Sequence, residues 1–129
     1  MPAMPNWNAY AAQCPTRVVL DRIADKWTVL ILGLLGQQPR RFNALLREIE
    51  GLSQKMLSQT LKRLERDGLV RRTVFATTPV TVEYALTPLG ETLAESLATL
   101  IRWAEDNIEA VQAAQRMFDA KTGADARPA

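Results

Sequence analysis

The most constraining feature of this sequence is a change of hydrophobic period at Gly68. Before this residue, two short segments repeat apolar residues at helical spacing on either side of Gly51, which tolerates the positive φ of a tight turn. After it, residues 70–75 are rich in β-branched residues, and residues 80–86 alternate apolar with polar side chains, as a half-buried strand does. Two short helices joined by a tight turn and followed by a hairpin predict a winged helix-turn-helix.

Leucine stripes define the two helices of the motif. Ser53 precedes the second helix in the position of an N-cap. The apolar positions are Phe42, Leu45, Leu46 and Ile49 in the first helix, and Leu57, Leu61 and Leu64 in the second. Upstream, residues 16–35 carry another helical stripe, and the polar pair Asp25 and Lys26 leaves open whether this stripe forms one helix or two.

A long final helix is expected after the hairpin, because Thr87 can cap it and Pro88 suits a first helical position. Its apolar residues follow a 4-3 spacing typical of a coiled-coil seam, with Asn107 as the polar interruption: Leu93, Leu97, Leu100, Ala104, Val111, Ala114 and Phe118. The chain is therefore expected to be mainly α with a small β-hairpin. Residues 1–13 form an N-terminal arm, residues 14–118 the winged helix-turn-helix domain with a C-terminal dimerisation helix, and residues 119–129 a disordered tail.

The basic residues are concentrated around the second helix of the motif. Residues 40–72 contain nine Lys or Arg against four acids, although the net charge of the whole chain is only +2. On a helical wheel, a polar stripe falls opposite the leucines: Lys55, Gln59, Lys62 and Arg66, flanked by Ser58 and Arg63. This pattern predicts a recognition helix for the DNA major groove, although a solvated face of an amphipathic helix would look similar.

The expected DNA contacts divide into two kinds. Base edges are assigned to the N-terminal residues of the helix, namely Gln54, Lys55, Ser58 and Gln59. Phosphates are assigned to Lys62, Arg63 and Arg66, with Arg40 and Arg41 before the motif and Arg71 and Arg72 at the wing base. The clustering of these cations around one helix favours DNA over an ordinary charged surface.

Several classes of protein are disfavoured by what the sequence lacks. It has no histidine and one cysteine, so a zinc site of the usual type within one subunit, a histidine-activated nucleophile and an intrachain disulfide are excluded. We therefore expect no metal, no cofactor and no enzyme activity. The N-terminus does not resemble a secretory signal, and no apolar run approaches the roughly 20 residues that cross a membrane. We expect a cytoplasmic protein that does not bind membranes.

Three segments of the chain resemble the HxlR-type regulators, relatives of the MarR group. They are CPTRVVLDRIADKWTVLILGLL, RRFNALLREIEGLSQKMLSQTLKRLERDGLVRR and VEYALTPLGETL, and the resemblance covers roughly residues 14–104. It implies a dimeric bacterial transcription factor in which residues 53–67 form the recognition helix, residues 69–86 the wing, and the terminal helices the dimer. Two departures stand out. Pro79-Val80-Thr81 replaces the usual Pro-Pro-Arg of the wing, and Ala24-Asp25 replaces a Gly-Gly pair, a change with no functional interpretation from the sequence.

Cys14 is a candidate redox or electrophile sensor. It lies at the start of a predicted helix with Arg17 nearby, and both a helix N-terminus and a cation favour the reactive thiolate. Some members of the resembled family sense oxidants through a cysteine at this position, whereas the alternative is a cysteine that only packs in the core. Trp27, Tyr84 and Trp103 could similarly line an effector pocket, but aromatic residues at helical spacing are more often part of the core.

Together these features predict a dimeric, sequence-specific DNA-binding transcriptional regulator. Its partners would be a second copy of the chain, double-stranded DNA with a pseudo-palindromic operator, and an oxidant or small-molecule effector. The alternative is a winged-helix protein–protein interaction module that does not bind DNA. Such a module needs the leucine face but not the Lys55, Gln59, Lys62 and Arg66 stripe, so charge reversal along this stripe separates the two hypotheses.

Overall fold

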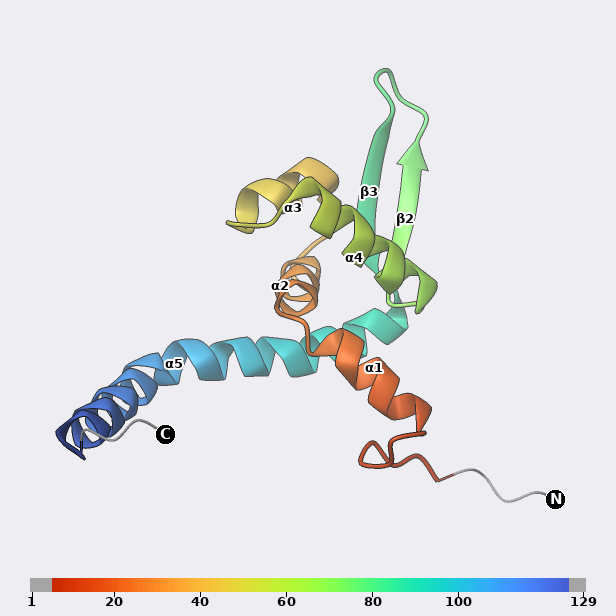
Figure 1. Ribbon diagram of the computed structural model, residues 1–129. Coiled ribbons are helices and arrows are strands. Elements are labelled where there is room, and N and C mark those ends of the chain that lie inside the picture. Colours follow the sequence, from red (N-terminus) through yellow and green to blue (C-terminus); the bar gives the residue numbers. More distant parts are fainter. Residues whose placement is uncertain (1–5, 126–129) are drawn as a thin grey trace. The chain divides into compact units, whose positions relative to one another are not determined.

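The computed structural model describes residues 6–125 and has the mainly α architecture that the sequence predicts (Figure 1). Its elements are α1 (Pro15–Ile23), α2 (Lys26–Leu35), β1 (Arg40–Arg41), α3 (Phe42–Glu48), α4 (Gln54–Arg66), β2 (Val70–Phe75), β3 (Thr81–Leu86) and α5 (Pro88–Asp125). The chain divides into two compact units, one ending at Leu97 and the other beginning at Ala98. The first unit is a winged helix-turn-helix, with α3 and α4 as its two helices.

The stripe over residues 16–35 forms two helices rather than one. Asp25 separates the two helices, because it has an extended backbone conformation between α1 and α2 and is the N-cap of α2. Its carboxylate accepts a hydrogen bond from the backbone N–H of Trp27 at 3.4 Å. An N-cap satisfies an N–H group that the first turn of a helix leaves without a partner, so Asp25 starts a new helix at this point.

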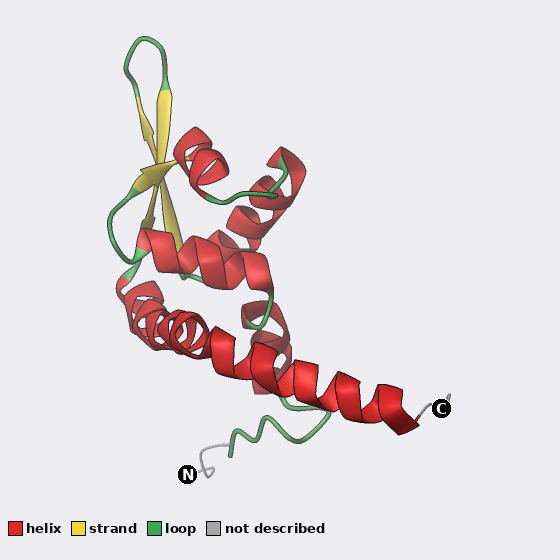
Figure 2. Cartoon of the chain, turned by 90° about the vertical axis from the view of Figure 1, so that its left-hand side faces the viewer, coloured by secondary structure: helices red, strands yellow, loops and turns green. Residues whose placement is uncertain are grey.

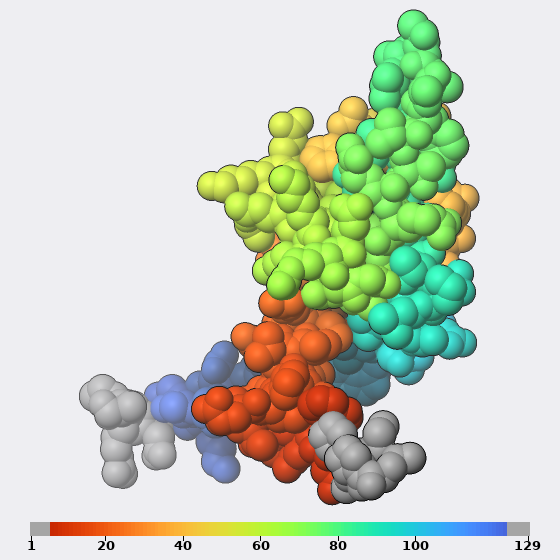
Figure 3. All heavy atoms as spheres, turned by 90° about the vertical axis from the view of Figure 1, so that its right-hand side faces the viewer, coloured from red at the N-terminus to blue at the C-terminus, as the bar shows by residue number. Residues whose placement is uncertain are grey.

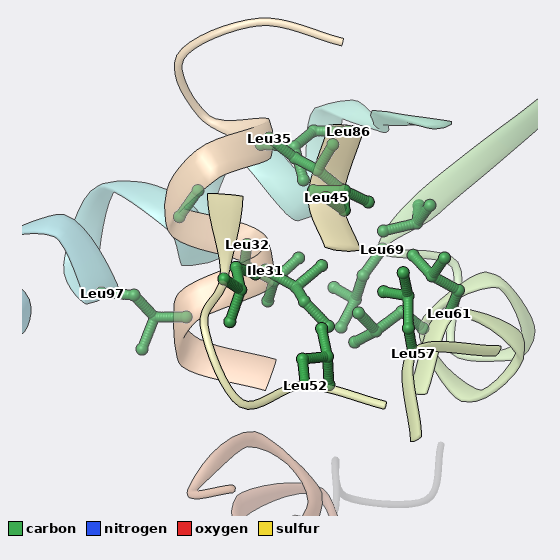
Figure 4. Packing of buried hydrophobic residues seen from close by; sticks show 14 residues of the cluster. Ile31, Leu32, Leu35, Leu45, Leu52, Leu57, Leu61, Leu69, Leu86 and Leu97 are labelled. Carbon is green, nitrogen blue, oxygen red and sulfur yellow. The ribbon is translucent and has the colours of Figure 1, made fainter. Parts of the chain in front are cut away.

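Leucine and isoleucine side chains from α2, α3 and α4 form the core of the first unit. Ile31, Leu32, Leu45 and Leu57 are completely buried. Figure 4 shows Leu57 and Leu61 of α4 in one cluster with Leu69 and Ile31, and the same cluster continues to Leu86 at the end of β3. The leucine stripe predicted for α4 therefore faces the core, which leaves the opposite side of this helix to solvent.

The wing contains a third strand that the sequence analysis did not predict. The sheet order is β1-β3-β2, and both pairings are antiparallel (Figure 2). In β1, Arg40 lies opposite Tyr84 and Arg41 opposite Glu83. The expected two-stranded hairpin is thus correct for β2 and β3 but incomplete. A two-residue strand is too short to show an alternating pattern in the sequence.

Helix α5 starts where the sequence predicts and ends later. The hydroxyl of Thr87 accepts a hydrogen bond from the backbone N–H of Gly90 at 3.0 Å, which confirms Thr87 as the cap before Pro88. The helix continues to Asp125, so the first part of the tail predicted from residue 119 is helical, and residues 126–129 of it lie outside the described residues. No proline interrupts residues 119–125, and several of them are good helix formers.

The N-terminal arm forms turns but neither helix nor strand between Asn6 and Gln13, while residues 1–5 lie outside the described part. Within residues 6–125, no helix combines the length and the apolar character that crossing a membrane requires.

Candidate nucleic-acid interface

The outer face of α4 is an exposed polar surface of the helix-turn-helix. Gly51 in the preceding turn has a φ of 87°, as the sequence predicts, and the Ser53 hydroxyl accepts a hydrogen bond from the backbone N–H of Met56 at 3.1 Å. These two features fix the start of α4. All six residues proposed for its outer face are exposed, and so is Gln54 at the start of the helix; the six are Lys55, Ser58, Gln59, Lys62, Arg63 and Arg66.

In the space-filling view, yellow-green side chains of the helix-turn-helix project from the surface beside the wing (Figure 3). Among the described residues, none forms an ion pair with Lys55, Lys62 or Arg66. Exposed cations without protein partners are available to a polyanion, because no internal contact has to be broken first. The local geometry of α4 therefore matches what a recognition helix requires.

Arg63 is more constrained than its neighbours on α4. Its Nη2 lies 3.5 Å from Oδ2 of Asp25 and 3.5 Å from the hydroxyl oxygen of Thr60. The sequence grouped Arg63 with the phosphate-binding cations, but it did not predict that a carboxylate from the α1–α2 junction would face it.

Arg40 does not lie on the exposed cationic surface that the sequence predicts. Its side chain is only 9% exposed and forms an ion pair with Glu48 of α3. Its other terminal nitrogen donates a hydrogen bond to Oε1 of Gln37 at 3.0 Å. Pairing of β1 with β3 holds this side chain against α3, so its guanidinium is already used within the protein.

Arg41 and Arg72 remain exposed on the wing, as expected. Arg41 lies opposite Glu83 in the β1–β3 register, and Arg72 lies opposite Tyr84 on β2. Arg41 also lines a groove between α3 and β3, together with Phe42, Val82 and Arg47. The exposed Arg47 was counted in the basic segment but not among the expected contacts; its place in the last turn of α3 was the signal that could have singled it out.

The tip of the wing is uncharged and carries exposed apolar side chains. Val74, Phe75 and Val80 are exposed, and no charged residue occurs between Thr73 and Val82. The sequence accounts for this, because Pro79-Val80-Thr81 contains no charged residue. The wing of this chain therefore offers cations at its base but none at its tip.

Cys14 is the N-cap of α1, and its half-buried thiol lies within a small hydrogen-bonded turn. The sulfur lies 3.0 Å from the Thr16 hydroxyl oxygen and accepts a hydrogen bond from the backbone N–H of Asn8 at 3.2 Å. The Thr16 hydroxyl contributes most to lowering the pKa of the Cys14 thiol, and the backbone N–H groups of Thr16, Asn8 and Arg17 lower it further. Partial desolvation opposes them, but the net direction is toward the thiolate. The sequence suggested two causes, the helix N-terminus and the Arg17 charge. Backbone N–H groups of the first turn of α1 do contribute, but the Arg17 charge is not among the causes, and the Thr16 hydroxyl was not predicted.

The three aromatic residues considered as an effector pocket have different surroundings. Trp27 and Tyr84 pack against the core, as the alternative interpretation expected. Trp103 lies in the second unit and is 58% exposed.

Comparison with known proteins places the chain among transcriptional regulators. The model of the HxlR-like helix-turn-helix family matches residues 22–112. The uncharacterized HTH-type transcriptional regulator YtfH of Escherichia coli K12 is 46% identical over 106 residues, which cover 82% of this chain and 84% of YtfH. The solved structure of the putative regulator ytfH from Salmonella typhimurium is 42% identical, with a TM-score of 0.81 over 86% of this chain and 99% of that one.

Two further structural neighbours are redox-related regulators. The reduced form of the redox regulator HypR is 33% identical, with a TM-score of 0.70 over 77% of this chain and 98% of that one. The diamide-treated form of YodB from Bacillus subtilis is 34% identical, with a TM-score of 0.62 over 74% of this chain and 96% of that one.

Proposed function

The chain belongs to the HxlR-like helix-turn-helix family of transcriptional regulators, and from this premise we propose that it acts as a cytoplasmic homodimer that binds a pseudo-palindromic operator in double-stranded DNA. The observation that carries this proposal is the outer face of α4, where Lys55, Lys62 and Arg66 are exposed and have no ion-pair partner among the described residues. The family consists of regulators rather than enzymes.

Within the operator, the two halves of α4 have different tasks. Gln54, Lys55, Ser58 and Gln59 lie in the N-terminal half, and their amide, ammonium and hydroxyl groups suit hydrogen bonds to base edges. Lys62 and Arg66 follow toward the C-terminus and contact phosphates, which fix the position of the helix in the groove. Arg41 and Arg72 add phosphate contacts from the wing base. Arg40 is left out of this set because Glu48 and Gln37 already bind its guanidinium.

Dimerisation is supported by the apolar residues that α5 leaves uncovered. Leu97 is buried in the core, whereas Leu100, Trp103, Ile108 and Phe118, all beyond it on the same helix, are exposed in the single chain. Exposed apolar side chains in such number usually mark an interface. A second copy would cover them and place two recognition helices roughly 34 Å apart, one turn of DNA.

Control by oxidants or electrophiles is proposed to act through Cys14. The lowered pKa of its thiol supports a reactive thiolate, and the hydrogen bonds from Asn8 and Thr16 join the cysteine to the arm and to the first turn of α1. Structural neighbours named for redox regulation or solved after diamide treatment support the same role. Alkylation or disulfide formation at the sulfur would break both hydrogen bonds and release this turn.

The competing hypothesis is a winged-helix interaction module that binds protein and not DNA. It makes no use of free cations on α4, so a double charge reversal, Lys62→Glu with Arg66→Glu, would leave its binding unchanged. For a DNA-binding regulator, the same variant loses DNA binding at any practical salt concentration because each lost cation is also replaced by a repulsive charge.

The experiment that tests the proposal is binding of the full chain to the DNA upstream of its own coding sequence, compared with a shuffled duplex of equal length. We expect sequence-selective binding that weakens steeply with salt. Repeating the titration after diamide treatment, with Cys14→Ser as control, tests the sensor: the wild type loses affinity and the variant does not. Binding that is equal on both duplexes would contradict the operator, and equal oxidant response in both proteins would contradict the sensor.

A further inference from the structure

Two ion pairs join the C-terminal half of the recognition helix to the junction between α1 and α2. Nη1 of Arg22 in α1 lies 2.8 Å from Oδ1 of Asp67 at the end of α4. Nη2 of Arg63 in α4 lies 3.5 Å from Oδ2 of Asp25 between α1 and α2. In the first pair the cation lies in α1 and the carboxylate at the C-terminal end of α4. In the second pair the cation lies in α4 and the carboxylate lies between α1 and α2. The side chains are partly exposed, so these pairs lie at the surface rather than in the core.

Both carboxylates belong to helix ends, but the two ends act on them differently. Asp67 is the C-cap of α4, where the negative end of the helix dipole makes a carboxylate unfavourable unless a cation neutralises it. Arg22 supplies that cation. Asp25 is the N-cap of α2, and its other carboxylate oxygen accepts the hydrogen bond from Trp27. Capping of α2 therefore fixes the position of the Asp25 carboxylate, which also accepts the ion pair from Arg63.

Asp25 is also the residue for which the sequence offered no role. Its carboxylate is the acidic partner of Arg63, and a residue without a side-chain acceptor at this position could not form the pair. The arginine in turn has Thr60 as its other hydrogen-bond partner, on the preceding turn of its own helix. The guanidinium of Arg63 is thus placed between α4 and the α1–α2 junction.

We propose that Asp25 and Arg22 are positioning residues for the recognition helix, and that Arg63 contributes to DNA binding through Asp25 rather than through a phosphate. The inference rests on the proposed DNA-binding function. Because Cys14 caps the same α1 helix that carries Arg22, the Arg22–Asp67 pair also connects the thiol-bearing helix to the end of α4. Surface ion pairs contribute little to folding stability, so variants that lose these pairs should remain folded, and their effect on DNA binding can be measured.

The first test compares Asp25→Asn with wild type in DNA titrations over a range of salt concentrations. Asparagine is as good an N-cap as aspartate, so this change keeps the α2 cap and removes only the charge that faces Arg63. Loss of the positioning contact lowers affinity about three- to tenfold at every salt concentration with an unchanged salt slope. If Arg63 instead contacts a phosphate, Asp25→Asn frees that cation and removes a repulsive charge, so affinity stays the same or rises, which overturns the proposal.

The second test uses Arg63→Gln and a charge exchange. Under the proposal Arg63→Gln lowers affinity without changing the salt slope, whereas loss of a phosphate contact reduces the slope by about 0.9. Arg22→Asp and Asp67→Arg each weaken DNA binding, and combining them restores most of it. Additive losses in the double variant would contradict a pairwise role.

Asp21→Asn is the matched control, because Asp21 is exposed on α1 and no ion pair to it is observed among the described residues. It should bind DNA like wild type. Thermal unfolding by circular dichroism confirms that each variant is folded. If wild type itself binds no DNA, the proposed function fails; if wild type and Asp21→Asn bind while Asp25→Asn is unimpaired, only the positioning role fails.

Discussion

The backbone of Gly90 in α5 lies directly against the carbonyl group of Leu69. A Cβ at position 90 would lie 2.0 Å from that oxygen and 3.0 Å from its carbon. The same carbonyl accepts a hydrogen bond from the backbone N–H of Thr87 at 3.1 Å, and the neighbouring carbonyl of Gly68 accepts one from the Thr87 hydroxyl at 2.5 Å. The start of α5 is therefore fixed to the segment that connects the recognition helix to the wing.

Gly90→Ala should be strongly destabilising. The methyl group meets backbone rather than a movable side chain, so either α5 or the α4–β2 connection has to shift, and we expect a loss of about 2–3 kcal/mol in the free energy of unfolding. Urea denaturation followed by circular dichroism measures this loss. Gly123→Ala is the control, because a Cβ there meets nothing within 4 Å, and it should cost no stability. Equal stability of both variants would contradict the packing described for Gly90.

The two halves of α4 should respond differently to substitution. Lys62→Ala or Arg66→Ala weakens binding to all duplexes and lowers the salt slope by about 0.9 for each lost phosphate contact. Gln59→Ala instead relaxes the preference for particular bases at an unchanged slope. Fluorescence anisotropy with operator variants measures both properties. Lys121→Ala, which removes an exposed cation far along α5, should leave them unchanged. The assignment of base and phosphate contacts is wrong if all three α4 variants behave alike.

Thiol reactivity at Cys14 should depend on Thr16. The hydroxyl of Thr16 is the main cause that lowers the pKa of the thiol, so Thr16→Val raises this pKa and Thr16→Ser retains the lowering. Only the thiolate reacts with iodoacetamide, so the pH at which the alkylation rate reaches half its maximum moves upward in Thr16→Val. Below that pH the variant reacts more slowly than wild type, and well above it the two rates converge. An unshifted pH profile would show that the hydroxyl does not stabilise the thiolate.

Self-association should depend on the apolar face of α5. Phe118 is 68% exposed in the single chain, and Phe118→Glu places a charge where a second copy would pack. Sedimentation equilibrium should show a shift toward monomer, and binding to a two-half-site operator should weaken relative to wild type, toward the affinity for non-specific DNA of the same length. Gln112→Glu, an equal addition of charge at an exposed position of the same helix, should remain dimeric. A dimer that persists in Phe118→Glu would remove Phe118 from the interface.

Much of the site could be predicted from the sequence because its signals are local. The leucine spacing of α4 determines which side faces the core, and therefore which side carries Lys55, Lys62 and Arg66. Gly51, Ser53 and Thr87 act within a few residues of their own position, as turn and cap residues do. These predictions need no knowledge of what lies elsewhere in the chain.

The tertiary structure alone decided which charges stay free. In the sequence, Arg40 and Arg63 cannot be distinguished from Arg41 and Arg66. In the structure, Arg40 forms an ion pair with Glu48, and Arg63 forms one with Asp25. Arg22 meets Asp67 across 45 positions of the chain, and β1 exists only because β3 lies beside it. Hydrophobic period and capping are properties of neighbouring residues. Ion pairs and strand pairing, in contrast, depend on distances that folding creates between remote segments, and no local pattern records them.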